Sequence, residues 1–104
     1  MTQRKRTLRR AADRGSEKLT RDRERLFTLS EGGSPERPIG VDVPTLVEIT
    51  AAAQRCPVCE GALDVSSHDA ETIGGRRLRV ARVVCRSCKR ARPIYFELKA
   101  STLS

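Results

Sequence analysis

The 104 residues are 38% apolar and include only three aromatic side chains, which excludes a large hydrophobic core and fits one small domain with an appendage. The 21 basic and 13 acidic residues leave a net charge of +8, which favours a polyanionic partner, although an arginine-rich codon usage would produce the same excess. No stretch reaches the roughly 18 apolar residues of a membrane span, and no apolar run follows the basic N-terminus as in a secretory signal. We therefore expect a cytoplasmic protein without membrane contact.

Residues 4–29 predict one basic helix, and we treat 1–33 as an N-terminal helical segment. Good helix formers fill residues 4–29 without a proline, and Gly32, Gly33 and Pro35 supply the stop signal. A weak heptad-like stripe alternates spacings of four and three: Leu8, Ala12, Gly15, Leu19, Asp22, Leu26 and Leu29. Two arrangements remain open. Either the half from Leu19 to Leu29 docks on the rest of the chain, or the helix projects and takes a protein partner.

Residues 34–49 predict a linker that leads into one strand. The stretch 31–45 contains three prolines and three glycines, so we expect no regular structure there. The sequence LVEIT at 46–50 is rich in β-branched residues and predicts a strand, although the AAAQ that follows is also compatible with a helical turn.

Residues 50–104 predict the folded domain. Alternating or β-branched patterns indicate short strands at 62–66, 77–84 and 92–98, which would form a three-stranded antiparallel sheet. The intervening residues 67–75 contain a Gly-Gly pair and predict a loop or hairpin turn. Together with the N-terminal helix, this predicts a small α+β protein.

Ser67, His68 and Asp69 lie in this predicted loop. Adjacency in sequence does not create the geometry of a catalytic triad, and we interpret His68 as a polar loop residue. No phosphate-binding loop, dinucleotide fingerprint or pair of catalytic carboxylates is present in the sequence. We therefore predict no catalytic residues, no enzymatic activity and no small-molecule substrate.

Four cysteines form two C-x-x-C pairs separated by 25 residues: Cys56, Cys59, Cys85 and Cys88. In a reducing cytoplasm such pairs are more often metal ligands than disulfides. Zn²⁺ takes four tetrahedral ligands, and two such turns supply all four. The sequence predicts a zinc site with a closed shell, while a thiol-redox pair or disulfides remain alternatives.

The stretches "CPVCEGALDV" and "VVCRSCKRARPIYFEL" resemble the zinc-ribbon family over roughly residues 50–99. The resemblance implies zinc held between two knuckles, with an antiparallel sheet built from the intervening and following strands. Pro57 after the first cysteine and Gly61 shortly after the second resemble the family's CPxCG knuckle, whereas Glu60 and Lys89 stand where glycine is usual. Those two residues must tolerate a positive φ, or their turns must adjust. Zinc ribbons serve in transcription, translation and assembly, so the resemblance leaves the function open.

Basic residues crowd around the second pair, and the only tyrosine follows. We predict nucleic-acid contact through Arg86, Lys89, Arg90, Arg92 and Tyr95, since arginine grips phosphate and tyrosine stacks on bases. Alternatively, these cations offset the charge of a zinc–thiolate centre while Tyr95 packs under the helix.

The sequence as a whole favours a non-enzymatic zinc-binding protein that acts with nucleic acid or in a nucleoprotein complex. One alternative is an adaptor whose helix 4–29 docks on a larger protein assembly. A second alternative is a thiol-redox or metal sensor.

Overall fold

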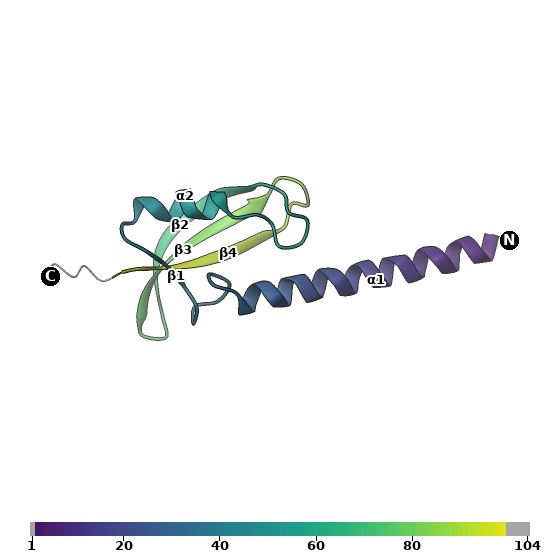
Figure 1. The fold of residues 1–104 in the computed structure, drawn as a ribbon, viewed down its shortest axis with the longest axis horizontal. Helices are drawn as coiled ribbons and strands as arrows, with labels where there is room; N and C mark the ends of the chain where they lie inside the picture. The colour runs from purple at the N-terminus through teal and green to yellow at the C-terminus, as the bar shows by residue number, and fades with distance from the viewer. Residues whose placement is uncertain (1, 100–104) are drawn as a thin grey trace.

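The computed structural model describes the backbone of residues 2–99 and the side chains of residues 15–99 (Figure 1). The predicted small α+β fold is confirmed. In chain order the elements are α1 (Thr2–Leu29), β1 (Ile39–Val41), α2 (Thr45–Ala53), β2 (Leu63–Ile73), β3 (Arg76–Cys85) and β4 (Ala91–Leu98). Below, residues 39–99 are called the sheet body.

The sheet has four strands in the order β1-β4-β3-β2. The three predicted antiparallel strands are present, but β2 continues through residues that we expected in a loop. His68 pairs with Ala81 and Asp69 with Val80, and the strand ends only at Ile73. Gly74 and Gly75 both have positive φ, 58° and 79°, so they make a two-residue hairpin turn that lets both strands run up to it. The prediction of a loop over 67–73 is therefore wrong.

The fourth strand, β1, lies inside the predicted linker and pairs in parallel with the C-terminal half of β4. Pro38 just precedes it, where no ladder donor is needed, and the N–H of Lys99 donates to the carbonyl of Val41 at 2.8 Å. Val41 is buried. The expectation of no regular structure over 31–45 is thus wrong for residues 39–41, because the free edge of β4 supplies their hydrogen-bond partners, and for Thr45, where α2 begins.

Helix α2 replaces the strand predicted over 46–50. Val47 and Ala51, four residues apart, are fully buried on the sheet, while Leu46 and Ile49 remain exposed. The three alanines extend the helix and outweigh the β-branched residues, since burial along one helical stripe stabilises the segment. The strand prediction is wrong here, and the helical turn considered for AAAQ belongs to this longer helix.

The main core lies between α2 and one face of the sheet. It joins Val47 and Ala51 to inward side chains of β3 and β4: Ala81, Val83, Ile94 and Phe96. Cys56 and Cys85 are also buried in this cluster. The cysteine knuckles therefore close one end of the core.

The predicted helix at the N-terminus is confirmed, and α1 projects beyond the sheet body (Figure 1). Its end is capped by Ser30, whose Oγ donates to the carbonyl of Leu26 at 2.7 Å, and by Gly32 at φ 87°. The helix touches the sheet body through Phe27, which packs against the core, and not through Leu26 or Leu29, which are exposed. Docking does occur, but on a different face from the predicted leucine stripe.

Within the part of the chain that the structure describes, no helix is both long enough and apolar enough to cross a membrane.

Candidate metal centre

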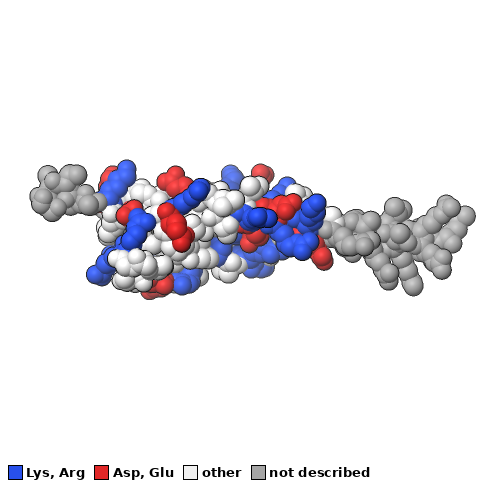
Figure 2. All heavy atoms as spheres, turned by 90° about the horizontal axis from the view of Figure 1, so that it is seen from below, with Lys and Arg blue, Asp and Glu red and all other residues white. Residues whose placement is uncertain are grey.

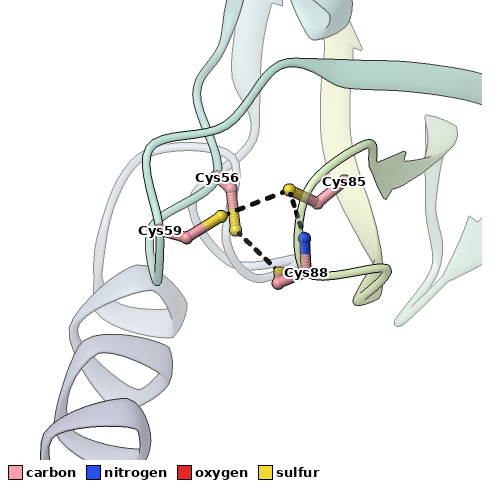
Figure 3. Close-up of side chains that lie close together, drawn as sticks. All are labelled: Cys56, Cys59, Cys85 and Cys88. Atoms are coloured by element: carbon pink, nitrogen blue, oxygen red, sulfur yellow. Dashed lines mark hydrogen bonds between the residues drawn. The ribbon is translucent and has the colours of Figure 1, made fainter.

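The four cysteine sulfurs meet at one end of the sheet body (Figure 3). Cys56 and Cys59 come from the turn between α2 and β2, and Cys85 and Cys88 come from the turn between β3 and β4. All four Sγ atoms lie within 4.8 Å of one another, with 3.7 Å from Cys56 to Cys88 and 3.4 Å from Cys59 to Cys85. Four thiolates at about 2.3 Å from a tetrahedral metal stand about 3.8 Å apart. The site can therefore hold a metal ion.

These separations exclude disulfides, in which sulfurs are about 2.05 Å apart, and all four cysteines are free. Among the described residues, the potential ligand group contains the four cysteines and does not contain His68. That histidine is half-buried in β2, where it pairs with Ala81.

The two knuckles share one backbone conformation. In the first, the N–H of Glu60 donates to Cys56 O at 2.8 Å, and the N–H of Cys56 donates to Gly61 O at 3.0 Å. The second repeats this pattern from Lys89 to Cys85 O and from Cys85 to Arg90 O, at 3.0 and 2.9 Å.

The fifth residue of each knuckle has a positive φ, 63° at Glu60 and 64° at Lys89. The position where the sequence departs from the glycine of the zinc-ribbon pattern is therefore a left-handed one. Glu60 and Lys89 therefore tolerate the positive φ, and both turns keep the same backbone hydrogen bonds.

Gly61 lets the two knuckles approach each other. A Cβ atom at this position would lie 2.9 Å from Cys85 Sγ and 2.8 Å from Ser87 Oγ. Both contacts are shorter than van der Waals contact, so a side chain would push the second pair away from the first. The resemblance to the knuckle motif singled out Gly61. Its role in spacing the knuckles depends on Cys85 and Ser87, which lie in the other turn.

Backbone amides make the cluster electrostatically asymmetric. The N–H groups of Cys88 and Ser87 each donate to Cys85 Sγ at 3.4 Å, and with a hydrogen bond from Cys59 they lower the pKa of Cys85 to about 6. For Cys59 the N–H of Gly61 acts to lower the pKa, but the hydrogen bond with Cys85, burial of the thiol and hydrogen bonds with Cys88 and Cys56 together raise the pKa to about 11. A thiolate on Cys85 that accepts the Cys59 proton fits both shifts. A divalent cation would displace that proton.

Arg92 supplies a buried positive charge beside the thiolates. Its side chain is 5% exposed, and Nη2 lies 4.0 Å from Cys56 Sγ. Its Nη1 forms an ion pair with Glu24 Oε1 at 2.5 Å, and its guanidinium covers the ring of Phe27, 5.1 Å from the centroid. We had grouped Arg92 with cations that face a polyanion. The structure instead buries Arg92 between α1 and the four cysteines, so its side chain does not face solvent.

The other predicted contact residues lie in different surroundings. Arg86 grips the Asp64 carboxylate, with Nε 2.8 and 2.9 Å from its two oxygens and Nη2 2.7 Å from one, and this hydrogen bonding lowers the pKa of Asp64. Lys89 and Arg90 are exposed, and within residues 15–99 no carboxylate forms an ion pair with either.

Tyr95 is half-buried, and its N–H donates to Gly32 O at 2.9 Å along the edge of β4. With Phe27, Pro35 and Pro93 it lines a hollow of about 480 Å³ between that edge and the end of α1. Tyr95 and the end of α1 thus line the same hollow. Pro93, two residues earlier, directs its nitrogen to the same edge, where no strand needs a donor.

Arg90 instead lines a second hollow, of about 570 Å³, together with Ser16, Glu17, Thr20 and Arg21 of α1. Arg21 of α1 and Arg90 beside the second knuckle thus line the same hollow. Figure 2 shows lysine and arginine side chains gathered, among some acidic ones, at the end of the sheet body from which α1 projects. We call Arg21, Lys89 and Arg90 the cationic end.

Comparisons with protein-family models, curated proteins and solved structures found no match to this chain. The assignment of a metal site therefore depends on the geometry of the four cysteines.

Proposed function

We propose that this chain is a zinc-ribbon protein whose four cysteines hold one structural Zn²⁺. The observation that carries the proposal is the meeting of the four Sγ atoms within 4.8 Å at the end of a core that contains two of them. A shell of four thiolates leaves no open position for substrate, which favours a structural over a catalytic role. When bound, the ion would hold the two knuckles together. Arg92 would offset part of the net negative charge of the centre.

Metal analysis of the full chain, purified under reducing conditions, tests the identity of the ion. We expect one equivalent of zinc and a colourless protein. Because a tetrahedral four-sulfur site also suits iron, visible absorption with one equivalent of iron would contradict the zinc assignment. Less than half an equivalent of any metal, with native folding retained after chelation, would contradict a structural metal altogether.

We further propose that the cationic end binds nucleic acid without strong sequence preference. Three features support this: Arg21 and Arg90 line the same hollow, Lys89 and Arg90 have no acidic partner among residues 15–99, and the chain carries a net charge of +8. Arginines that converge from two elements can contact successive phosphates of one strand. Arg86 contributes less, because Asp64 already occupies its guanidinium.

Fluorescence anisotropy with labelled 20-nucleotide RNA and DNA at increasing salt tests this binding. We expect dissociation constants of roughly 10⁻⁴–10⁻⁶ M near physiological salt. The triple variant Arg21→Ser, Lys89→Asn, Arg90→Ser should lower the slope of log K against log salt by up to about 3.

The matched control variant is Arg76→Ser, Arg77→Ser, Lys99→Ser, which removes the same charge at the opposite end of the sheet body. If affinity fell equally in both variants, binding would depend on the net charge of the chain and not on the cationic end. Absence of binding by the unmodified chain at low salt would refute the proposal.

A further inference from the structure

Helix α1 has two functional faces, and the sheet body occupies only one. Glu24 and Phe27 reach the sheet body, the first through Arg92 and the second through the core. The guanidinium of Arg23, between the two faces, also donates to the carbonyl of Val58. Leu19, Leu26 and Leu29 remain 50%, 63% and 56% exposed. At 100° per residue the leucines are centred about 140° around the helix from the docked pair. The sheet body therefore cannot cover both faces at once.

The exposed face has the spacing of a coiled-coil seam. If Leu19 and Leu26 take heptad position a, then Asp22 and Leu29 take position d. We call these four residues the α1 seam. The backbone of α1 is helical for 28 residues, about 42 Å, so its length suits a helical partner of three to four heptads.

Charge is segregated around this seam. The flanking e and g positions between residues 16 and 25 hold no acid; they are Ser16, Lys18, Arg23 and Arg25. Arg23 donates to the carbonyl of Val58 in the sheet body, so Lys18 and Arg25 are the cations that face away from it. Glu17 and Glu24 lie on the opposite side, where Glu24 pairs with Arg92. A seam flanked only by basic or neutral residues attracts a partner with acidic residues at its own e and g positions.

We propose that the α1 seam binds an acidic amphipathic helix of another protein. A second copy of α1 would place the basic e and g side chains of the two helices opposite one another in either orientation, and these like charges repel. A nucleic acid would satisfy the flanking cations but leave the leucines in water. An acidic helix covers the leucines and pairs with the cations together.

Asp22 sets a further requirement on this partner. Its carboxylate would be desolvated between the leucines, at a cost that a basic or amide side chain on the partner would offset. A single polar residue within such a seam fixes register. Against a partner with leucine at every a and d position, Asp22 should weaken binding.

The probe for this proposal is a synthetic 28-residue peptide with Leu at a and d and Glu at e and g. One control peptide has the same composition in scrambled order, and a second has Lys at e and g. By fluorescence anisotropy with the full chain, we expect the acidic heptad peptide to bind at least tenfold more tightly than either control. The variant Leu19→Ser, Leu26→Ser should lose at least tenfold, while Asp22→Leu should gain several-fold.

Matched variants separate this surface from others. Leu46→Ser with Ile49→Ser removes two exposed apolar side chains from α2 and should leave peptide affinity unchanged. The triple variant of the cationic end should also bind the acidic heptad peptide with unchanged affinity. Loss of nucleic-acid binding can therefore be told apart from loss of peptide binding by the α1 seam. Lys18→Glu with Arg25→Glu should abolish binding.

Three results would overturn the proposal. Equal binding of the scrambled acidic peptide would show that charge alone acts. Unchanged affinity in Leu19→Ser, Leu26→Ser would show that the leucines take no part. Sedimentation that reveals a dimer of the unmodified chain, lost in that same variant, would assign the seam to a second copy.

Discussion

The sheet body and helix α1 are stabilised in different ways. In the sheet body, apolar side chains from α2, β3 and β4 form a continuous cluster that ends at the cysteine knuckles. Helix α1 contacts the sheet body through few side chains, chiefly Phe27 and Glu24, with Arg23 donating to the carbonyl of Val58. A continuous buried core holds the first region together, whereas the Phe27 ring, the Glu24–Arg92 ion pair and the Arg23 hydrogen bond hold the second against it. Damage to the sheet body should therefore disturb the whole chain, while damage to the α1 contacts should release only the helix.

The largest effect expected is from loss of the metal. Cys85→Ser, or chelation of the unmodified chain, should unfold the sheet body, because a core this small contributes only about 3–5 kcal/mol by itself. Amide chemical-shift dispersion in NMR spectra measures the loss, and Ser87→Ala, which retains all four ligands, serves as the control. A dispersed spectrum after complete metal removal would contradict the prediction.

The second effect should separate the two regions. Arg92→Met removes the cation that joins Glu24, Phe27 and the thiolates, and should lower the free energy of unfolding by about 2–4 kcal/mol because Glu24 loses its partner. Zinc content should stay at one equivalent while amide resonances around Phe27 shift toward those of a detached helix. The comparison variant is Arg82→Met, whose exposed ion pair with Glu71 should contribute less than about 1 kcal/mol. If both substitutions lowered the free energy of unfolding equally, Arg92 would stabilise the protein no more than an exposed ion pair does.

A third, opposite effect should appear in the sheet body alone. Lys89→Gly places glycine at φ 64° and should raise the free energy of unfolding by about 0.5–1 kcal/mol, since glycine adopts this conformation without steric cost. Glu60→Gly should act similarly in the first knuckle. Ser87→Gly, at a position without positive φ, should not stabilise. Denaturant unfolding of the metal-bound protein gives the three values, and destabilisation by Lys89→Gly would show that its side chain matters more than its backbone.

The smallest effect concerns Asp64 and Arg86, both exposed. The hydrogen bond from Arg86 lowers the pKa of Asp64 below its ordinary 3.8, so the pair stabilises the fold above that pH and loses its contribution as pH falls through the lowered value. Arg86→Gln should return the pKa toward 3.8, as a carboxyl NMR titration will show. An unchanged pKa in that variant would mean that Arg86 does not hold the carboxylate.

Short-range patterns in the sequence were sufficient for much of the structure. The two C-x-x-C pairs predicted a four-cysteine group because each turn brings its own two sulfurs together, and the sulfurs do meet. The departure from glycine at Glu60 and Lys89 located two left-handed residues, since backbone conformation at one position depends on local sterics. The proline-free segment before Gly32 and the Gly-Gly pair before β3 likewise predicted a helix and a hairpin turn. Each of these features depends on neighbours in the chain.

Tertiary structure decided whatever depends on residues far apart in the chain. Residues 45–53 became a helix because Val47 and Ala51 find a sheet to pack against, and residues 39–41 became a strand because β4 offers a free edge. His68 joined β2 because β3 is long enough to pair with it. Arg92 and Arg90 look alike in the sequence, yet Arg92 is buried against the Phe27 ring and Arg90 is exposed, because α1 covers only one of them. Arg92 and the core likewise determine which face of α1 docks, because an ion pair and a partly buried ring stabilise docking more than an interrupted leucine stripe does.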